Sequence, residues 1–185
     1  MSYGADLLPV TFAAGPVGRW SIERITPIRG ETLPRATRLD MHEGPFTRGE
    51  ESWVLHGITS NARYVERAEK LELDARSPRL GRSDATRAVL IPIQKSPAWW
   101  ALAQDERRAV FEARSQHIAG SLPYLPRIAR RLHHSRELGG PYDFLTWFEF
   151  APEHAAAFDE LLGTLRASEE WTYVESEVEL RLARV

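Results

Sequence analysis

The stretch RIARRLHHSRELGGPYDFLTWFEF, residues 127–150, predicts two strands joined by a turn. Residues 127–134 and 144–150 are the strands, because both runs alternate apolar or aromatic residues with other side chains. The glycines and the proline of residues 137–143 mark the turn between them. Such a hairpin between two helical segments is the centre of a ferredoxin-like unit.

The periodicity on both sides of this hairpin predicts an α+β chain. A helix is expected over 105–120, with Asp105 as its cap and Gly120 at its end, and another over 152–168. The other expected strands lie at 19–30, 52–59, 85–93 and 171–185. A helix is expected at 60–74, capped by Ser60 or Asn61, with Tyr64, Ala68 and Leu71 on one face. A short helix is expected at 95–100, capped by Ser96. The second half of this order is ferredoxin-like with an added helix.

We expect one domain over residues 1–185, because no stretch is long or polar enough to act as a linker. Residues 1–17 are interpreted as a loose leader, and the polar residues 31–51 as a loop or lid. In this interpretation residues 1–51 contribute a leader, one strand and a loop, and residues 52–185 form the core.

The composition excludes several classes of site and partner. The chain is 43% hydrophobic and 27% charged, with a net charge of -2 and a pI near 6.3, so electrostatic capture of nucleic acid is not expected. It contains no cysteine, which excludes disulfides, iron–sulfur clusters and thiolate-bound zinc or haem. No apolar run approaches the ~18 residues of a membrane span, and the N-terminus lacks a basic signal-peptide region, so we expect a cytoplasmic protein.

His117 is the first candidate for a functional group. On a helix over 105–120 it would share a face with Val110 and Ala113, three and four residues apart, and would point inward. One interpretation is a core histidine bonded to a carbonyl. The other is an axial metal ligand, since neutral imidazole is the commonest protein ligand for metals.

The strand at 127–134 places a second candidate. With a period of two, Ile128, Arg130, Leu132 and His134 face one way and His133 faces the other. The adjacent histidines therefore cannot chelate one zinc ion. If Ile128 and Leu132 are buried, Arg130 is buried between them and requires an anion, either a nearby glutamate or a bound ligand.

Two further clusters complete the pattern. Lys95 precedes Trp99 and Trp100, which form either plain core packing or a flat aromatic wall with N–H donors. Glu169 and Glu170 form either a solvated acidic pair or place one carboxylate where it accepts the N–H of a ligating imidazole. An aromatic slot with an inward histidine, an inward arginine and a lysine for carboxylates fits haem b.

These residues, in this order, resemble the chlorite dismutase family. The matching pieces are SNARYVERAEK, LIPIQKSPAWWAL, ERRAVFEARSQHIAGSLPYLPRIARRLHHS, YDFLTWFEFAPEH and LRASEEWTYV. The specific element is K-x-x-x-W-W followed by histidine seventeen residues after the second tryptophan and by arginine thirteen residues later. The short chain resembles the compact, dimeric branch, whose fold is a dimeric α+β barrel of ferredoxin-like units.

The resemblance implies a role for each matching position. One haem b per subunit would be ligated by His117 as the proximal and metal ligand, and Glu170 rather than Glu169 would accept the other ring N–H. Arg130 would be the catalytic residue above the iron. The remaining contacts implied are Tyr64, Lys95 and Trp99 with the haem propionates, Trp100 on the proximal side, and Leu132, Thr146 and Phe148 around the distal pocket.

The implied reaction converts chlorite into chloride and dioxygen through ferryl haem and hypochlorite, and a homodimer is the implied assembly. Arg130 would attract chlorite and hold hypochlorite until it recombines. The chain departs from the family's usual LYHS by reading LHHS at 132–135. The alternatives are a coproheme decarboxylase, a peroxidase-like or haem-sensing protein of the same superfamily, and a haem-free barrel dimer that binds a small molecule.

Overall fold

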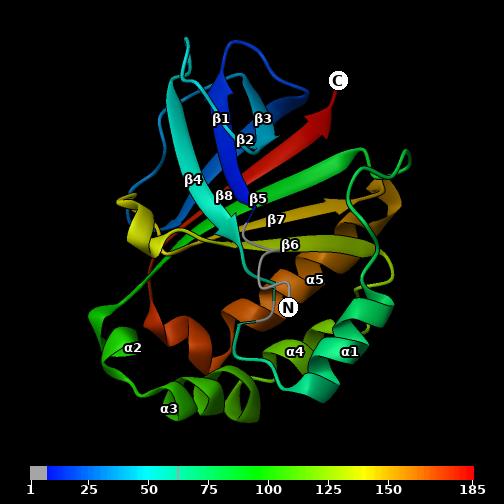
Figure 1. The fold of residues 1–185 in the computed structure, drawn as a ribbon. Coiled ribbons are helices and arrows are strands. Elements are labelled where there is room, and N and C mark those ends of the chain that lie inside the picture. Colours follow the sequence, from blue (N-terminus) through cyan, green and yellow to red (C-terminus); the bar gives the residue numbers. More distant parts are fainter. Residues whose placement is uncertain (1–7, 62) are drawn as a thin grey trace, which may run out of the picture.

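A computed structural model describes residues 8–61 and 63–185 (Figure 1). Eight strands form a closed barrel, and most of the helices gather below one end of it. The strands are β1 Pro9–Gly15, β2 Trp20–Arg29, β3 Arg38–Glu43, β4 Trp53–Thr59, β5 Arg87–Lys95, β6 Ile128–His134, β7 Phe144–Phe150 and β8 Val174–Arg184. The helices are α1 Arg67–Arg76, α2 Pro97–Ala101, α3 Gln104–Arg108, the π-helix η1 Ala109–Arg114, α4 His117–Ser121, α5 Ala155–Arg166 and the 3₁₀ turns η2 Arg136–Leu138, η3 Pro152–His154 and η4 Glu169–Tyr173.

The strand order confirms the α+β barrel of ferredoxin-like units. Around the barrel the order is β1-β3-β2-β8-β5-β7-β6-β4, and every neighbouring pair is antiparallel. Read in one direction around the barrel, the first four strands run β4-β1-β3-β2 and the last four run β8-β5-β7-β6, which is the same ferredoxin-like order twice. Only the second half carries helices, since residues 8–59 contain none.

The predicted leader is wrong for residues 9–15, because they form β1 in the first half of the barrel. Val10 and Phe12 face the barrel interior and are 1% and 0% exposed. Residues 1–7 of that predicted leader lie outside the described residues. The predicted loop at 31–51 likewise contains β3, in which Leu39 is buried while Asp40 and His42 point outward. Its alternation is too short and too polar to stand out in the sequence.

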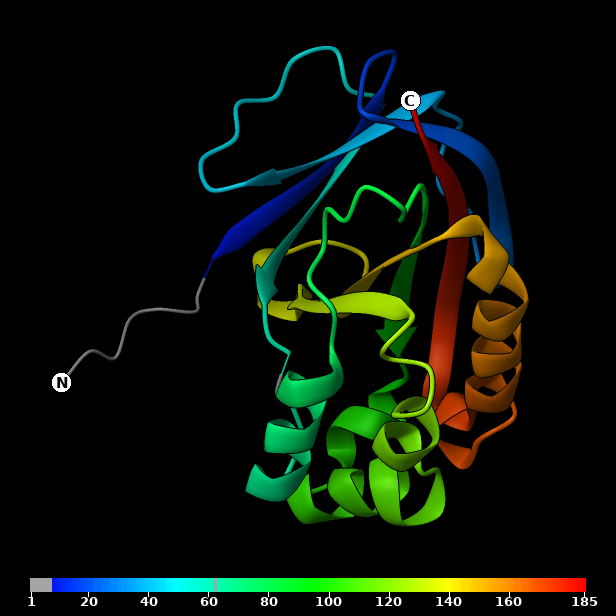
Figure 2. The ribbon, with the colours of Figure 1, turned by 90° about the vertical axis from the view of Figure 1, so that its right-hand side faces the viewer.

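Two faces of the sheet are buried against different partners. Phe12, Trp20, Trp147 and Leu180 belong to the cluster that fills the barrel interior. The outer face of the second half packs against α5, whose predicted apolar stripe is confirmed: Phe158, Leu161, Leu162 and Leu165 are all buried. Figure 2 shows α5 lying along the outside of this half of the sheet.

The helix predicted at 60–74 begins later than expected. It starts at Arg67, and Glu66 is its cap in a capping box with Glu69. Ser60 and Asn61 do not cap it, because the Ser60 N–H donates to the Leu132 carbonyl and Asn61 Oδ1 accepts the Leu132 N–H. Ser60 and Asn61, which resemble helix-capping residues in the sequence, therefore bind the backbone of β6 at Leu132. The expected apolar face is also wrong in detail, since Leu73 is buried and Leu71 is exposed.

The single helix predicted at 105–120 is interrupted. It divides into α3, the π-helix η1 and α4, and Gln116 between the last two has φ 49° and ψ 39°. His117 therefore begins a new short helix rather than ending a long one, and Ala113 is exposed instead of sharing an inward face with Val110. Widened helical turns of this kind occur mostly at functional sites. Within the described part of the chain, no helix has the length and apolar character needed to cross a membrane.

Candidate haem site

A pocket lies between the outer face of β5, β6 and β7 and the helices α1, η1, α4 and α5, which contribute to its lining. It contains roughly 1090 Å³ of space free of protein atoms, its open mouth included. Figures 1 and 2 show α1, the α3–α4 segment and the end of α5 around this side of the sheet. Most of its lining is apolar, which is typical of a site for a large flat ligand. Nine of the ten predicted site residues line it: Tyr64, Lys95, Trp99, His117, Arg130, Leu132, Thr146, Phe148 and Glu170.

His117 enters the pocket from the helical side. Its Nδ1 lies 2.6 Å from Glu170 Oε2, and Lys95 Nζ donates to Glu170 Oε1 at 2.8 Å. A carboxylate that accepts the Nδ1 proton leaves Nε2 free as a ligand and makes it more basic. The imidazole lies nearly parallel to the rings of Phe111 and Trp171, whose centroids are 4.3 Å and 6.4 Å away. His117 is therefore bonded to a carboxylate and not to a carbonyl, an arrangement that would suit a metal ligand.

Glu170 is 4% exposed, and its two oxygens are held by the His117 imidazole and the Lys95 ammonium. Burial by itself raises the pKa of this carboxyl, but the charges and hydrogen bonds of His117 and Lys95 outweigh it and lower the pKa to about 2. Its backbone N–H is held by Ser115 Oγ at 2.9 Å. Glu170 is thus a fixed carboxylate across the usual pH range.

Arg130 enters the pocket from the sheet side. Along β6 it lies between Ile128 and Leu132, and its register partner on β7 is Phe148. Among the described residues its guanidinium has neither a hydrogen bond nor an ion pair, and burial lowers its pKa, an effect that the charge of Glu170 partly opposes. The glutamate partner that the sequence left open for Arg130 is therefore not present as a direct contact. A half-buried guanidinium without a partner favours an anionic ligand.

Three more donors lie at the end of the pocket near Phe144. Tyr64 Oη, Trp99 Nε1 and Arg63 Nε are all buried without a partner in the part of the chain that the structure describes. The Tyr64 and Trp99 rings meet edge to face at 5.9 Å, and Arg63 lies 5.6 Å from the Phe144 ring centroid. Buried donors are costly when unpaired, so this end of the pocket is built for an acceptor such as a carboxylate.

A family model described as "Chlorite dismutase" matches residues 36–185. The chain belongs to the chlorite dismutase family. A chlorite dismutase from Ideonella dechloratans is 33% identical over 133 residues, which cover 71% of this chain and 42% of that longer protein. The crystal structure of a dimeric chlorite dismutase from Nitrobacter winogradskyi is 56% identical, with a TM-score of 0.89, and the match covers 95% of this chain and 99% of that one.

More distant members of the chlorite dismutase family share the fold. A variant of the enzyme from Candidatus Nitrospira defluvii is 22% identical with a TM-score of 0.70, and the match covers 98% of this chain and 93% of that one. The family implies a haem cofactor. The donor set fits that group, because it offers one imidazole for the iron on the helical wall and a group of buried donors for carboxylates at one end.

Two predicted site residues of this chlorite dismutase family member make contacts that the resemblance did not imply. Trp100 does not line the pocket: its Nε1 donates to Asp143 Oδ2 at 3.2 Å, and its ring stacks on Phe144. Lys95 lines the pocket but is engaged by Glu170, and its Nζ lies 4.4 Å from the Trp99 ring centroid. In the structure the Lys95 ammonium therefore pairs with the carboxylate behind the histidine, and its contact with a propionate stays a prediction.

The sequence pattern missed Arg63, Phe111 and Trp171. Arg63 precedes Tyr64 and Trp171 follows Glu170, so closeness to a predicted site residue was the available signal. Phe111 carried no such signal, because the π-helix decides which side of the segment it occupies. Glu169, the less favoured carboxylate, pairs instead with Arg114 at 3.2 Å.

Proposed function

We propose that this chain is a haem b enzyme that converts chlorite into chloride and dioxygen. One observation carries the proposal: a histidine backed by a buried carboxylate and an arginine without a partner face one pocket from its two walls. The curated and crystallographic relatives are named chlorite dismutases, which supports the same activity. One haem per subunit follows from one such histidine in the pocket.

The unequal ends of the pocket support haem b over coproheme, which carries two more propionates. Near Phe144 the lining includes the unpaired donors of Arg63, Tyr64 and Trp99. At the opposite end of β6, next to Ile128, the lining residues of α5 are Leu161, Leu162 and Leu165. These aliphatic side chains cannot satisfy two further carboxylates but fit vinyl groups. The pocket therefore favours a macrocycle with carboxylates at one edge only.

Each wall then has a separate task. Bound haem supplies an iron that accepts an oxygen atom from chlorite. Glu170 accepts the His117 Nδ1 proton, so that Nε2 would bind the iron as a strong donor. Arg130 stays protonated and offers forked donors to an oxyanion, so it would attract chlorite into the pocket and hold the hypochlorite formed there. Leu132 and Phe148 exclude water from the same wall.

The decisive experiment is an oxygen electrode with haem-loaded protein. Addition of chlorite should release O₂ at once, in one equivalent per chlorite consumed.

Arg130→Ala should bind haem but release O₂ at least tenfold more slowly and bleach after fewer turnovers. His117→Ala should bind haem weakly and lose the Soret band of the wild type. A colourless protein, or a haem protein without O₂ release, contradicts the proposal.

We also propose that the chain assembles as a homodimer. The support is its 56% identity, over 95% of its length, to a chlorite dismutase described as dimeric. Sedimentation velocity of the purified protein should give about 42 kDa, twice the 21.0 kDa of one chain. A 21.0 kDa species at micromolar concentration contradicts it.

A further inference from the structure

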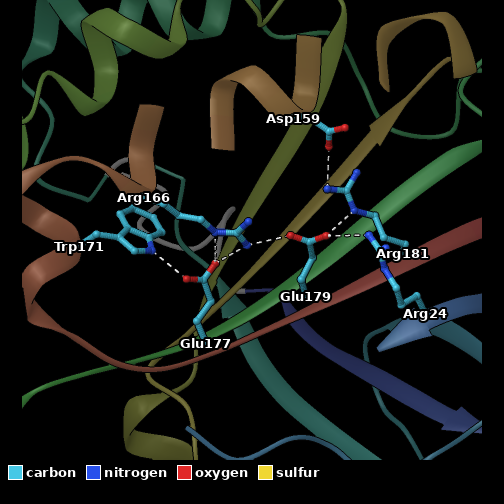
Figure 3. Close-up of polar contacts among 7 residues, drawn as sticks. All are labelled: Arg24, Asp159, Arg166, Trp171, Glu177, Glu179 and Arg181. Carbon is cyan, nitrogen blue, oxygen red and sulfur yellow. Dashed lines mark hydrogen bonds and ion pairs between the residues drawn. The ribbon is translucent and has the colours of Figure 1, made fainter. Parts of the chain in front are cut away.

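A second buried network lies behind the pocket, between α5 and the outer face of β8 (Figure 3). Glu177 is 1% exposed and its Oε1 accepts two bonds from Arg166, from Nε at 2.9 Å and from Nη2 at 2.6 Å. Arg166 also reaches Glu179, which is 3% exposed and is held by Arg181 as well. Ion pairs this deep require that every oxygen finds a donor.

The other oxygen of Glu177 points toward the haem pocket. Its Oε2 accepts the Trp171 indole N–H at 2.8 Å, and Figure 3 shows the indole and the Arg166 guanidinium on the same carboxylate. The Trp171 carbonyl is held as well, by Arg29 at 3.2 Å. Because both its ring and its backbone are bonded, the Trp171 side chain has one orientation.

That orientation places the Trp171 ring against both partners of Glu170. The ring lies nearly parallel to the His117 imidazole, at 25°, and Lys95 Nζ is 5.5 Å from its centroid. Trp171 is the immediate neighbour of Glu170 in the turn η4. A rotation of the indole would therefore open space beside the imidazole and disturb the Glu170 carboxylate at the same time.

We propose that Glu177 is a positioning residue for the proximal histidine: it fixes the Trp171 indole, and the indole keeps the His117–Glu170–Lys95 chain in one geometry. This inference rests on the proposed function, because it assigns His117 to the iron. Arg166 serves the same end by neutralising the Glu177 charge. Neither Glu177 nor Arg166 lines the pocket, so both act through Trp171.

Glu179 offers a matched control. It is as buried as Glu177 and shares Arg166 with it, but it has no contact with Trp171. Glu177→Gln leaves one acceptor oxygen where two are used, and the Arg166 charge competes for it with the indole. Glu179→Gln makes the same chemical change in the same network without touching the indole. Trp171→Phe removes the indole N–H and leaves the ion pairs intact.

The test compares resonance Raman spectra of the ferrous haem protein and its ferric/ferrous midpoint potential. Glu177→Gln and Trp171→Phe should both lower the Fe–His stretching frequency and raise the potential, because a misaligned Glu170 makes the imidazole a weaker donor. The double variant should shift no further than either single variant. Glu179→Gln should match the wild type in both measurements.

Three outcomes overturn the inference: no shift in Trp171→Phe, equal shifts in the Glu177 and Glu179 variants, or additive shifts in the double variant. If Glu177→Gln fails to fold, Trp171→Phe against Glu179→Gln decides alone. A readout without haem accompanies them, since the indole proton of Trp171 in the apoprotein should move upfield in Glu177→Gln only. A wild type without an Fe–His band contradicts the proposed function instead, and is separate from these results.

Discussion

Glu169 and Glu170 are neighbours in the sequence, yet the turn η4 sends their side chains to different environments. Glu170 is buried between His117 and Lys95, whereas Glu169 is 40% exposed and pairs with Arg114. The two residues therefore provide a matched test of the proximal carboxylate. Replacing Glu170 by glutamine removes a charge from the site, and replacing Glu169 by glutamine removes a charge from the surface.

Glu170→Gln should raise the ferric/ferrous midpoint potential of the haem protein. A neutral amide stabilises the ferric state less, and a loss of about 1.4 kcal/mol corresponds to about 60 mV for one electron. Glu169→Gln should leave the potential within about 10 mV of the wild type, because a surface pair is worth little and is screened by salt. Spectroelectrochemical titration measures both, and equal potentials in all three proteins contradict the role of Glu170.

His133 is a buried residue on the opposite face of β6 from Arg130. It lies in the barrel interior, where Nδ1 donates to the Leu145 carbonyl at 3.0 Å, and Nε2 has no partner among the described residues. Its ring meets Phe12 edge to face at 5.2 Å. Burial is the main cause that lowers its pKa, from 6.5 to about 4. The folded protein therefore holds His133 neutral where the unfolded chain would protonate it.

The free energy of unfolding should consequently fall as the pH drops from 6.5 toward 4. In this range the unfolded state binds the proton and the folded state does not, so stability is complete above pH 6.5 and declines by up to about 3 kcal/mol near pH 4. His133→Leu should cost about 1 kcal/mol at pH 7 through the lost hydrogen bond and should flatten this decline. Urea titrations at several pH values check it; parallel curves for both proteins contradict it.

The residue scale also shows where sequence reasoning works. The alternation of β6 is local, so a period of two was enough to place Arg130 and His133 on opposite faces of the strand, while the resemblance indicated which face meets the pocket. The choice between Glu169 and Glu170 came from the resemblance, because it depends on a 3₁₀ turn whose geometry is set by tertiary contacts. The pairing of Lys95 with Glu170 was not predicted, because the two residues are 75 positions apart in the sequence.

At the scale of elements, the helix predicted over 105–120 shows what periodicity cannot predict. A spacing of three and four residues assumes an uninterrupted α-helix, but η1 adds a wider turn, and Gln116 adopts a left-handed conformation before α4. A left-handed backbone at a residue other than glycine is strained and persists only where its surroundings demand it. Here it lets His117 begin a new helix that faces the pocket.

The helix α1 is held beside the pocket mainly by one ion pair. Arg108 donates to both carboxylate oxygens of Glu69, at 2.5 and 2.8 Å, and to the Tyr64 carbonyl at 2.5 Å. Hydrogen bonding to Arg108 lowers the pKa of Glu69, and Leu73 is the one described residue of α1 buried in the neighbouring apolar cluster. Since Tyr64 and Leu73 line the pocket, we expect α1 to move aside when haem enters or leaves.

Glu69→Gln should therefore release haem faster, by about fivefold, because a bidentate pair of this kind contributes about 1 kcal/mol. Glu72→Gln is the control, since it breaks an exposed pair with Arg76 inside the same helix. Haem transfer to an excess of apomyoglobin measures the rate. Equal rates for the two variants would show that the Glu69–Arg108 pair does not hold the pocket closed.

At the scale of the whole molecule, the two halves share a strand order, but the pocket is lined by residues that follow β4. The strands β2 and β8 pair over most of their length, whereas the register between β4 and β6 consists of the two pairs Ile58–His134 and Thr59–His133. The second half was readable from the sequence because its helices and strands have distinct periods. In the first half the sequence predicted the strands at 19–30 and 52–59, which are β2 and β4, but it missed the short strands β1 and β3.

Haem binding should protect the second half from hydrogen exchange and leave the first half unchanged. A ligand that binds only the folded pocket stabilises the elements that must open to release it. Amides of residues 67–121, from the start of α1 to the end of α4, should exchange at least tenfold more slowly in the haem-loaded protein than in the apoprotein. A tenfold slower exchange corresponds to an increase of about 1.4 kcal/mol in the free energy of opening. Amides of β1 and β3 face no part of the pocket and should exchange at the same rate in both forms.

Hydrogen exchange followed by mass spectrometry of peptides measures the two halves separately. Protection spread evenly around the barrel would mean that both halves open together, and the division of tasks between them would then be wrong.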